Sequence, residues 1–307
     1  MSARLPPTAS GRWPDPEAIL ALAPNEADEL LDRLESEVPV RPGFYEVSDP
    51  RLQTAVVFGD THGDWRATRA PVDRFLAARS TDALLGLGDY VDRAMHDCRE
   101  GSVANALWLL GLAAEHPERV ILTVGNHEMV RRIPALPHDL PEEVDQLWGP
   151  EAERYSRLLG LLERGPLAVR TQSGAYLAHA GFPRGSPPDW KHRLEHADDD
   201  TLIDVVWADC APSHIDRGIA PPFDEEELTK FLALVKCSIF LRGHDPDVTG
   251  RSLFHDRCLT LHTTRFYERF GGVIYAELPL DRPVKSTADV RVLHAPVEGR
   301  RFPEGAG

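Results

Sequence analysis

The feature that most constrains the fold is a short apolar run that recurs along the chain and ends each time in glycine and a polar residue. Three runs in the first half end in this way: TAVVF (Thr54–Phe58) before Gly59-Asp60, DALLGL (Asp82–Leu87) before Gly88-Asp89, and RVILTV (Arg119–Val124) before Gly125-Asn126. Stretches with helical character lie between them, at residues 67–79 and 102–115. Alternation of strand, loop and helix is typical of an α/β sheet. Wholly apolar strands indicate a sheet that is buried on both faces.

Strand signals return in the second half of the chain, and two of these strands end in histidine. The signals lie at residues 167–170, 175–178, 238–241, 258–262 and 272–277, with a weaker one at 289–293. His179 directly follows the second of these strands, and His244 follows the third after Arg242-Gly243. Five strands therefore deliver Asp, Asn or His at their carboxyl ends, the edge of an α/β sheet where binding sites form. One such loop would be an ordinary turn at the end of a strand, but five together indicate a functional site.

Composition excludes several classes of protein. The 307 residues include 34 basic and 49 acidic side chains, a net charge of −15, and 42% of the residues are hydrophobic. That apolar fraction rules out global disorder. The acidity argues against non-specific nucleic-acid binding, which needs a basic face. A local positive site for a phosphorylated substrate remains compatible with the overall charge.

Location and redox state also follow from the sequence as expectations. The chain has no apolar run of about 18 residues, so no membrane span is expected. The N-terminal stretch MSARLPPTASGRW lacks the apolar segment of a signal peptide, which predicts a cytoplasmic protein. We expect reduced, mostly buried thiols, because no CxxC pair occurs among the four cysteines, Cys98, Cys210, Cys237 and Cys258.

The chain divides into three expected segments: a helical extension at residues 1–50, a catalytic domain at 51–280, and a C-terminal tail at 281–307. Asp15-Pro16 predicts a helix start, because proline fits the first helical position. Asn25 is expected to cap a second helix. Residues 141–163 look like a helical insertion into the catalytic domain. Nothing in the sequence predicts the oligomeric state.

The donor types at the strand ends point to a metal centre. Six side chains offer carboxylate, imidazole or amide donors and none is a thiolate: Asp60, His62, Asp89, Asn126, His179 and His244. This set suits Mn, Fe or Zn rather than a closed structural zinc site. Six donors are too many for one catalytic ion but suit two ions roughly 3.5–4 Å apart with a bridging carboxylate. Asp89 is the natural bridge, and such a pair would convert a shared water to hydroxide at neutral pH.

The motifs GDTHG, GDYVDR, GNHE, HAG and RGH, in this order, resemble those of the phosphoprotein phosphatase family of metallophosphoesterases. These are the serine/threonine phosphatases and their bacterial relatives. The similarity runs from about Thr54 to Glu277. Trp207-Ala208-Asp209 resembles the family's WSD segment, Asp216-Arg217-Gly218 resembles NDRG, and Thr260–Tyr267 lies where the family has TLFSAPNY. The second motif reads VDR rather than VAR, which favours protein phosphatases over diadenosine polyphosphate hydrolases.

The resemblance implies a fold and a role for each matching residue. The fold is a four-layer α/β/β/α sandwich with two mixed sheets. One metal would be held by Asp60, His62 and Asp89, and the other by Asp89, Asn126, His179 and His244. The phosphate oxygens would contact Arg93, Arg217, Asn126 and Tyr267. His127, supported by Asp92, would protonate the leaving alkoxide.

Elementary chemistry agrees with several of these roles. A planar guanidinium such as that of Arg93 or Arg217 matches phosphate bidentately. The His127 imidazole can be kept cationic by a nearby carboxylate. The chain departs from the family where Ala94 replaces a glycine after VDR, and in the stretch that contains Arg265. Arg265 could favour an acidic peptide or a nucleotide, or pair with Glu268; it bears on the substrate rather than on the metals.

We therefore expect a metal-dependent phosphatase with two divalent ions, most naturally Mn, with Fe or Zn as alternatives. It would hydrolyse phosphoserine and phosphothreonine in proteins by direct attack of a metal-bridging hydroxide. The alternative is a hydrolase of dinucleoside polyphosphates or other small phosphate esters with the same site. A catalytically dead scaffold is disfavoured because no ligand is missing, and a nuclease would need a basic groove. No nucleic-acid or membrane partner is expected.

Overall fold

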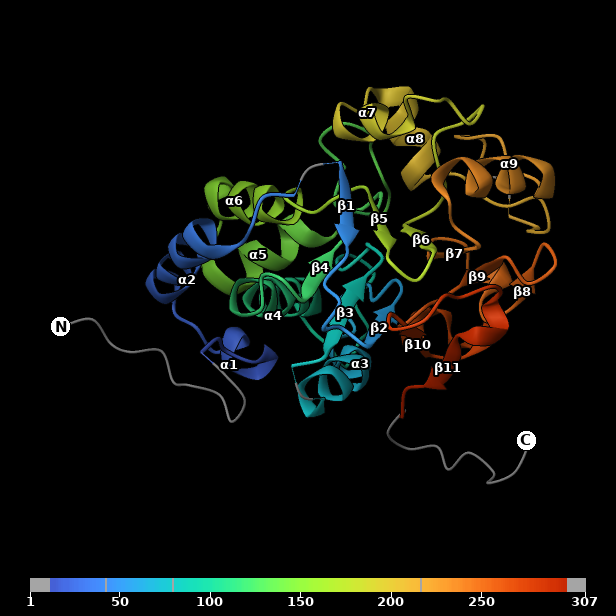
Figure 1. Cartoon of the computed structure of the whole chain (residues 1–307). Coiled ribbons are helices and arrows are strands. Elements are labelled where there is room, and N and C mark those ends of the chain that lie inside the picture. Colours follow the sequence, from blue (N-terminus) through green and yellow to red (C-terminus); the bar gives the residue numbers. More distant parts are fainter. Residues whose placement is uncertain (1–11, 42, 79, 216, 297–307) are drawn as a thin grey trace.

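Two β-sheets lie face to face between two groups of helices, as Figure 1 shows. The computed structural model describes residues 12–41, 43–78, 80–215 and 217–296. The five-stranded sheet has the order β11-β10-β2-β3-β4. Its strands are β2 (Thr54–Phe58), β3 (Asp82–Gly86), β4 (Val120–Leu122), β10 (Ile274–Pro279) and β11 (Arg291–His294). β2, β3 and β4 run parallel, whereas β10 is antiparallel to β2, so the sheet is mixed.

The six-stranded sheet has the order β1-β5-β6-β7-β9-β8. Its strands are β1 (Phe44–Val47), β5 (Ala168–Thr171), β6 (Ala175–Ala178), β7 (Ile239–Arg242), β8 (Ser252–Leu253) and β9 (Cys258–Thr260). β6, β7 and β9 are parallel neighbours, and β5 and β8 pair antiparallel with β6 and β9. The carboxyl ends of β6 and β7 therefore lie at one edge, as those of β2, β3 and β4 do in the other sheet.

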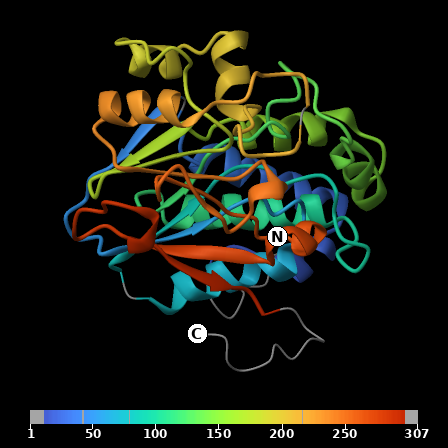
Figure 2. The same ribbon diagram turned by 90° about the vertical axis from the view of Figure 1, so that its right-hand side faces the viewer.

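The outer layers are helical. The first covers the five-stranded sheet and consists of α1 (Pro16–Leu20), α2 (Pro24–Glu37), α3 (Trp65–Ala77), α4 (Gly101–Glu115), α5 (Leu140–Trp148) and α6 (Ala152–Leu162). The second covers the six-stranded sheet and consists of α7 (Trp190–Glu195), α8 (Asp199–Val206) and α9 (Glu225–Val235). The view in Figure 2 shows α7, α8 and α9 stacked above the sheets. A short helix, α10 (Glu268–Gly271), leads into β10.

Alternation of side chains along β2 shows why both faces of a sheet are buried. Val56 and Phe58 belong to the apolar cluster beneath the first helical layer. Ala55 and Val57 belong to the cluster between the two sheets, which also contains Leu177 and other residues of the second sheet. Because successive strand residues point to opposite faces, a wholly apolar strand contributes side chains to both clusters. The expected four-layer α/β/β/α sandwich is confirmed.

Of the two N-terminal helices, α1 begins where the sequence predicts and α2 does not. The Asp15 side chain accepts a hydrogen bond from Ala18 N at 2.9 Å and caps α1, as predicted. The expected cap of α2 at Asn25 is wrong: the helix begins at Pro24, with Ala23 in the cap position. Proline fixes φ near the helical value and needs no N–H there, so the helix starts two residues earlier than it would with Asn25 as its cap.

Some elements of the fold were not predicted, whereas the state of the cysteines was. The strand β1 and the helices α7, α8 and α9 were not predicted from the pattern. The four cysteines are free, as expected. Among the described residues, no helix is long and apolar enough to cross a membrane.

Candidate metal centre

Loops from both sheets bring the predicted ligands into one buried cluster. These residues follow β2, β3 and β4 of one sheet and β6 and β7 of the other: Asp60, His62, Asp89, Asn126, His179 and His244. Backbone contacts join the two edges. Asp60 forms a parallel bridge with His262, just beyond β9, and Gly243 N donates to the His179 carbonyl at 2.8 Å. The sheets therefore hold donors from distant parts of the sequence at fixed separations.

Three donor atoms from different loops converge on one point. His179 Nε2 lies 2.9 Å from Asn126 Oδ1 and 3.1 Å from His244 Nδ1, and the last two atoms are 3.1 Å apart. His179 Nδ1 faces the Leu87 carbonyl at 2.9 Å, so that nitrogen carries the hydrogen and Nε2 presents its lone pair. With His244 in the tautomer that leaves Nδ1 without a hydrogen, three lone pairs would converge here, and a cation among them would remove their repulsion. The arrangement fits a divalent metal ion.

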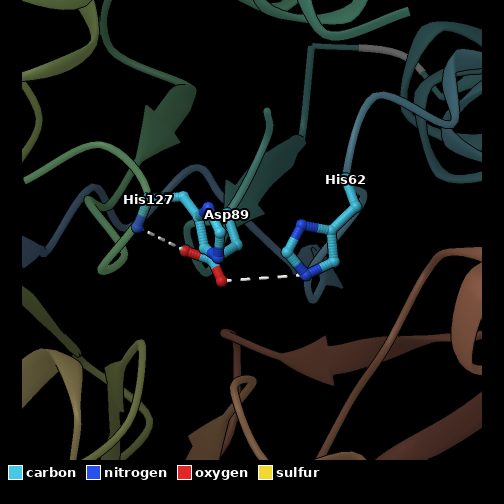
Figure 3. Close-up of side chains that lie close together, drawn as sticks. All are labelled: His62, Asp89 and His127. Atoms are coloured by element: carbon cyan, nitrogen blue, oxygen red, sulfur yellow. Dashed lines mark hydrogen bonds and ion pairs between the residues drawn. The ribbon is translucent and has the colours of Figure 1, made fainter. Parts of the chain in front are cut away.

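Asp89 lies between this group and a second one. Asp89 Oδ2 is 3.5 Å from His179 Nε2 and 3.8 Å from His62 Nε2. His62 Nε2 is also 3.8 Å from Asp60 Oδ2, and its Nδ1 is oriented by the Val91 carbonyl at 3.0 Å. Figure 3 shows the Asp89 carboxylate reaching toward His62 on one side and the His127 backbone on the other. A carboxylate with one neighbour group on each side has the geometry of a bridging ligand.

The charge states of the cluster suit metal binding. Burial lowers the pKa of His62 to about 4, so its imidazole is neutral at pH 7. Burial, with Arg217 next, also holds the pKa of His244 well below its usual value. Neutral imidazoles and an ionised carboxylate are the forms that bind metal.

The backbone of the site is held in an uncommon conformation. Five site residues have positive φ: His62 at 45°, Asp89 at 55°, Asp92 at 65°, Arg93 at 55° and His244 at 70°. This region costs a residue with a side chain about 1–3 kcal/mol and clusters at functional sites. Such a conformation persists only where the surrounding structure fixes it, as the hydrogen bonds of these loops do here.

Two glycines leave room for the ligand carboxylates. A Cβ on Gly125 would lie 2.3 Å from Asp89 Oδ1, and a Cβ on Gly243 would lie 2.1 Å from Asp60 Oδ1. Any side chain at either position would displace a ligand. Glu128 further secures the turn, because its carboxylate accepts hydrogen bonds from Asp89 N and Gly125 N at 2.8 and 2.7 Å.

Two arginines and a tyrosine lie at the rim of the cluster. Arg93 Nη1 donates to the Tyr267 hydroxyl and lies 3.4 Å from His62 Nε2. Arg217 donates to Asp209 Oδ1 through Nη1 and to the His244 carbonyl through Nη2, the latter at 3.1 Å. Both guanidinium groups therefore lie next to predicted metal ligands, where they could contact a phosphate bound at the metals. Asp216, which belongs to the motif that contains Arg217, lies outside the described residues.

One ring nitrogen of His127 contacts a carboxylate, and the other has no hydrogen-bond partner among the described residues. Its Nδ1 lies 2.6 Å from Asp92 Oδ2, and within the described residues its buried Nε2 has no hydrogen-bond partner. One ring nitrogen of His127 lies within 4.8 Å of donor atoms of His62 and Asp89. Burial would raise the pKa of Asp92, but hydrogen bonds from His127 and His138 bring it well below its usual range. Asp92 is therefore a charged partner that orients the His127 ring.

All of the residues predicted for the site lie in or beside this cluster, together with two histidines that were not predicted from the sequence, His138 and His262. His138 Nδ1 lies 2.9 Å from Asp92 Oδ2, and its Nε2 is 2.9 Å from the Tyr155 hydroxyl. It belongs to the loop before the helical insertion, where no motif marks it. His262 lies against Asp60; its position just after a strand was the available signal. Arg265 is clamped by Asp64 and Asp97, so its charge is compensated.

Comparison with known proteins identifies the family. Residues 54–247 match the model of the calcineurin-like phosphoesterases. The chain belongs to this family. The calcineurin-like phosphoesterase match ends just after His244 and so includes all six predicted ligands.

Individual relatives are phosphatases by name. The chain is 24% identical to a probable serine/threonine-protein phosphatase of Encephalitozoon cuniculi, over 71% of this chain and 48% of the relative. It is 25% identical to the serine/threonine-protein phosphatase 4 catalytic subunit of Kluyveromyces lactis, over 64% of each. The chain thus spans about half to two thirds of the length of these relatives.

Two solved structures have a fold similar to that of this chain. A serine/threonine phosphatase from Saccharomyces cerevisiae with similarity to human phosphatase PP5 superposes with a TM-score of 0.71 at 19% identity, covering 92% of both chains. A cold-active protein-tyrosine phosphatase of a psychrophilic Shewanella superposes with a TM-score of 0.53 at 16% identity, covering 80% of both chains. At these identities the likeness extends to the fold alone.

Proposed function

We propose that this calcineurin-like phosphoesterase is a dimetal phosphomonoesterase that removes phosphate from phosphoserine and phosphothreonine in proteins. One observation carries the proposal: two converging donor groups share Asp89 and lie beside two arginines and an imidazole with an available nitrogen. The ions are most naturally manganese, with iron or zinc as alternatives, because the donors are oxygens and imidazoles. We place the protein in the cytoplasm, with phosphorylated proteins rather than nucleic acids or membranes as partners.

Each residue has a role in the proposed reaction. Bound to this site, two divalent ions supply hydroxide at neutral pH and positive charge for the phosphoryl oxygens. Arg93 and Arg217 bind the remaining phosphate oxygens through charge-assisted hydrogen bonds. Tyr267 accepts a hydrogen bond from Arg93 and so orients its guanidinium. Asn126 would contribute its amide to the ion shared with His179 and His244 and to the phosphate.

His127 supplies the proton that the leaving group needs. A serine or threonine alkoxide is a poor leaving group and must be protonated as it departs. The Asp92 carboxylate, 2.6 Å from Nδ1, orients the ring and leaves Nε2 without a partner among the described residues. Asp92 itself is fixed by backbone N–H donors of Asp139 and Leu140 at 2.7 and 3.0 Å.

The names of the relatives support a protein substrate, because both are serine/threonine-protein phosphatases. We further propose that residues 51–280 form the catalytic unit, between a mostly helical extension at 1–50, which also supplies strand β1, and a tail at 281–307, which supplies strand β11. The sheet edge that carries the donors lies within this unit.

A side-by-side activity panel tests the proposed substrate. After loading with Mn, kcat/KM is measured on a phosphoserine peptide, a phosphotyrosine peptide, diadenosine tetraphosphate and bis(p-nitrophenyl) phosphate. We expect the phosphoserine peptide to be the best substrate, and a His179→Ala variant, which lacks a ligand, to be inactive on all four. Preference for diadenosine tetraphosphate would support the alternative small-phosphate hydrolase, and preference for the diester would indicate a nuclease-type enzyme.

A further inference from the structure

His262 is a buried histidine at the edge of the cluster to which no motif assigns a role. Its side chain has 0% exposure. It lies two residues beyond β9, where its backbone forms a parallel bridge with Asp60. Residues paired in a parallel bridge direct their side chains to the same face of the sheet. The Asp60 carboxylate and the His262 imidazole therefore point the same way.

A neighbouring threonine determines which His262 nitrogen carries the hydrogen. The Thr249 hydroxyl donates to the Pro246 carbonyl at 2.9 Å, because a carbonyl can only accept. His262 Nδ1 lies 2.8 Å from the same hydroxyl oxygen, and so it must donate its own hydrogen to that oxygen. Nε2 of the neutral ring is then left with a lone pair. A polar partner on the far nitrogen that fixes the tautomer is characteristic of metal-binding histidines.

This nitrogen faces the Asp60 carboxylate. His262 Nε2 is 3.3 Å from Asp60 Oδ2, and in the described part of the chain it has no hydrogen-bond partner. Two lone pairs this close in a dry site repel each other, and a metal ion bound by both atoms would remove that repulsion. Donors that share an ion through bonds of about 2.1 Å lie roughly 3.0–3.4 Å apart, which matches this separation.

We propose that His262 Nε2 is a fourth protein ligand of the metal ion held by Asp60, His62 and Asp89. The phosphoprotein phosphatase motif TLFSAPNY has phenylalanine at this position, so the ligand is a feature of this chain. A second imidazole makes the Asp60 site richer in nitrogen, which strengthens its hold on transition metals. The inference rests on the metal centre of the proposed function and not on its substrate.

Metal titration of the purified full chain tests this ligand. Free Mn²⁺ is followed by its EPR signal while the metal-free protein is titrated, in wild type and in His262→Phe. We expect two sites in both proteins, with one of them weakened by at least about 10–100-fold in the variant. His116→Phe, at a histidine that follows the carboxyl end of α4 and packs against Phe75, is the matched control and should bind like wild type.

A second variant, His179→Ala, shows which of the two ions His262 binds. His179→Ala removes a ligand of the other site, so its remaining ion should depend on His262. The double variant His262→Phe/His179→Ala should then retain no tight site. Wild-type Mn²⁺ affinity at both sites of His262→Phe would overturn the proposal, whatever the enzyme's substrate proves to be.

Thermal unfolding separates a ligand from a purely structural histidine. If His262 is a ligand, His262→Phe should unfold near the wild-type temperature without metal and gain less stability when Mn²⁺ is added. Destabilisation of the metal-free protein with an undiminished gain from Mn²⁺ would instead mean that His262 only pairs with Asp60. Should His262→Phe fail to fold, Thr249→Val, which removes only the orienting hydroxyl, must still weaken one site; unchanged binding there would also contradict the proposal.

Discussion

At the scale of single residues, the proposed chemistry needs a proton at the leaving oxygen, and His127 is placed to supply it. His127→Asn should lose about 10²–10⁴-fold in kcat on a phosphoserine peptide, the usual contribution of general acid catalysis. The loss on p-nitrophenyl phosphate should be clearly smaller, because p-nitrophenolate is a stable leaving group. Steady-state kinetics on both substrates, together with metal analysis, measure the difference.

Asp92→Asn is the matched partner of this variant. It should show a weaker form of the same substrate bias, since Asp92 acts on the proton only through the His127 ring. Equal losses on the two substrates in His127→Asn would show that His127 is not the acid. Loss of a metal ion in that variant would show that it is a ligand.

Arg93 and Arg217 should bind phosphate and not metal. Arg93→Ala is expected to lower kcat/KM by a few kcal/mol of transition-state stabilisation, roughly 10²-fold or more, because a charged donor is lost. Metal content should be unchanged, as measured by elemental analysis. Inhibition by free inorganic phosphate should weaken in both alanine variants; inhibition as strong as in wild type would contradict this role.

At the scale of elements, the start of α4 is tied to α5 by a buried carboxylate. Glu143 accepts hydrogen bonds from Ser102 N and Ser102 Oγ at 2.8 and 2.7 Å. Ser102 Oγ in turn accepts from Asp92 N at 2.9 Å, so this contact reaches the site. Burial raises the pKa of Glu143 to about 7, despite these hydrogen bonds.

This raised pKa predicts a pH-dependent stability. The folded state holds the Glu143 proton more tightly than the unfolded state, so the contribution is complete below about pH 4.5 and is lost as pH rises to about 7. The free energy of unfolding of wild type relative to Glu143→Gln should therefore fall by on the order of 2–3 kcal/mol between pH 5 and 8. Urea denaturation at several pH values measures it. A difference that is constant or rises with pH would contradict the prediction.

The packing of α2 bears on the proposed division near residue 50. Leu31 is 1% exposed in the same apolar cluster as Phe58 of β2 and residues of α4. Leu31→Ala should lower the free energy of unfolding by about 2–5 kcal/mol. Arg157→Ala, which removes ion pairs to Asp32 and Glu35 on the exposed side of α2, should cost about 1 kcal/mol or less. Comparable small losses in both would indicate that α2 is only a loosely attached extension.

At the scale of the whole molecule, the layers follow from local pattern, but several contacts do not. β2 and β6 have the bounds that their apolar runs predict, because a strand buried on both faces has no polar interruptions. The glycines that follow the strands marked the positions of the donors. Only glycine fits where the backbone turns tightly or lies against a ligand carboxylate. Helices such as α8 were missed because short segments carry little periodic signal.

The contacts of His138 and His262 could not be predicted from sequence. Each meets its carboxylate across a long stretch of chain, His138 at Asp92 and His262 at Asp60. Such pairs are set by the packing of the sheets and the insertion, not by spacing along the chain. The start of α2 at Pro24 was missed for a different reason, since a proline and a capping side chain compete as helix-start signals.

The most direct test of a two-metal phosphatase is a titration of activity against metal content. Metal-free protein is loaded with increasing Mn²⁺, and kcat/KM on a phosphoserine peptide is plotted against ions bound per chain. We predict negligible turnover of the metal-free protein and a plateau at two ions per chain, with Asp89→Asn losing both occupancy and activity because it removes the shared carboxylate. Full activity with a single bound ion, or no phosphoserine hydrolysis with two, would contradict the account.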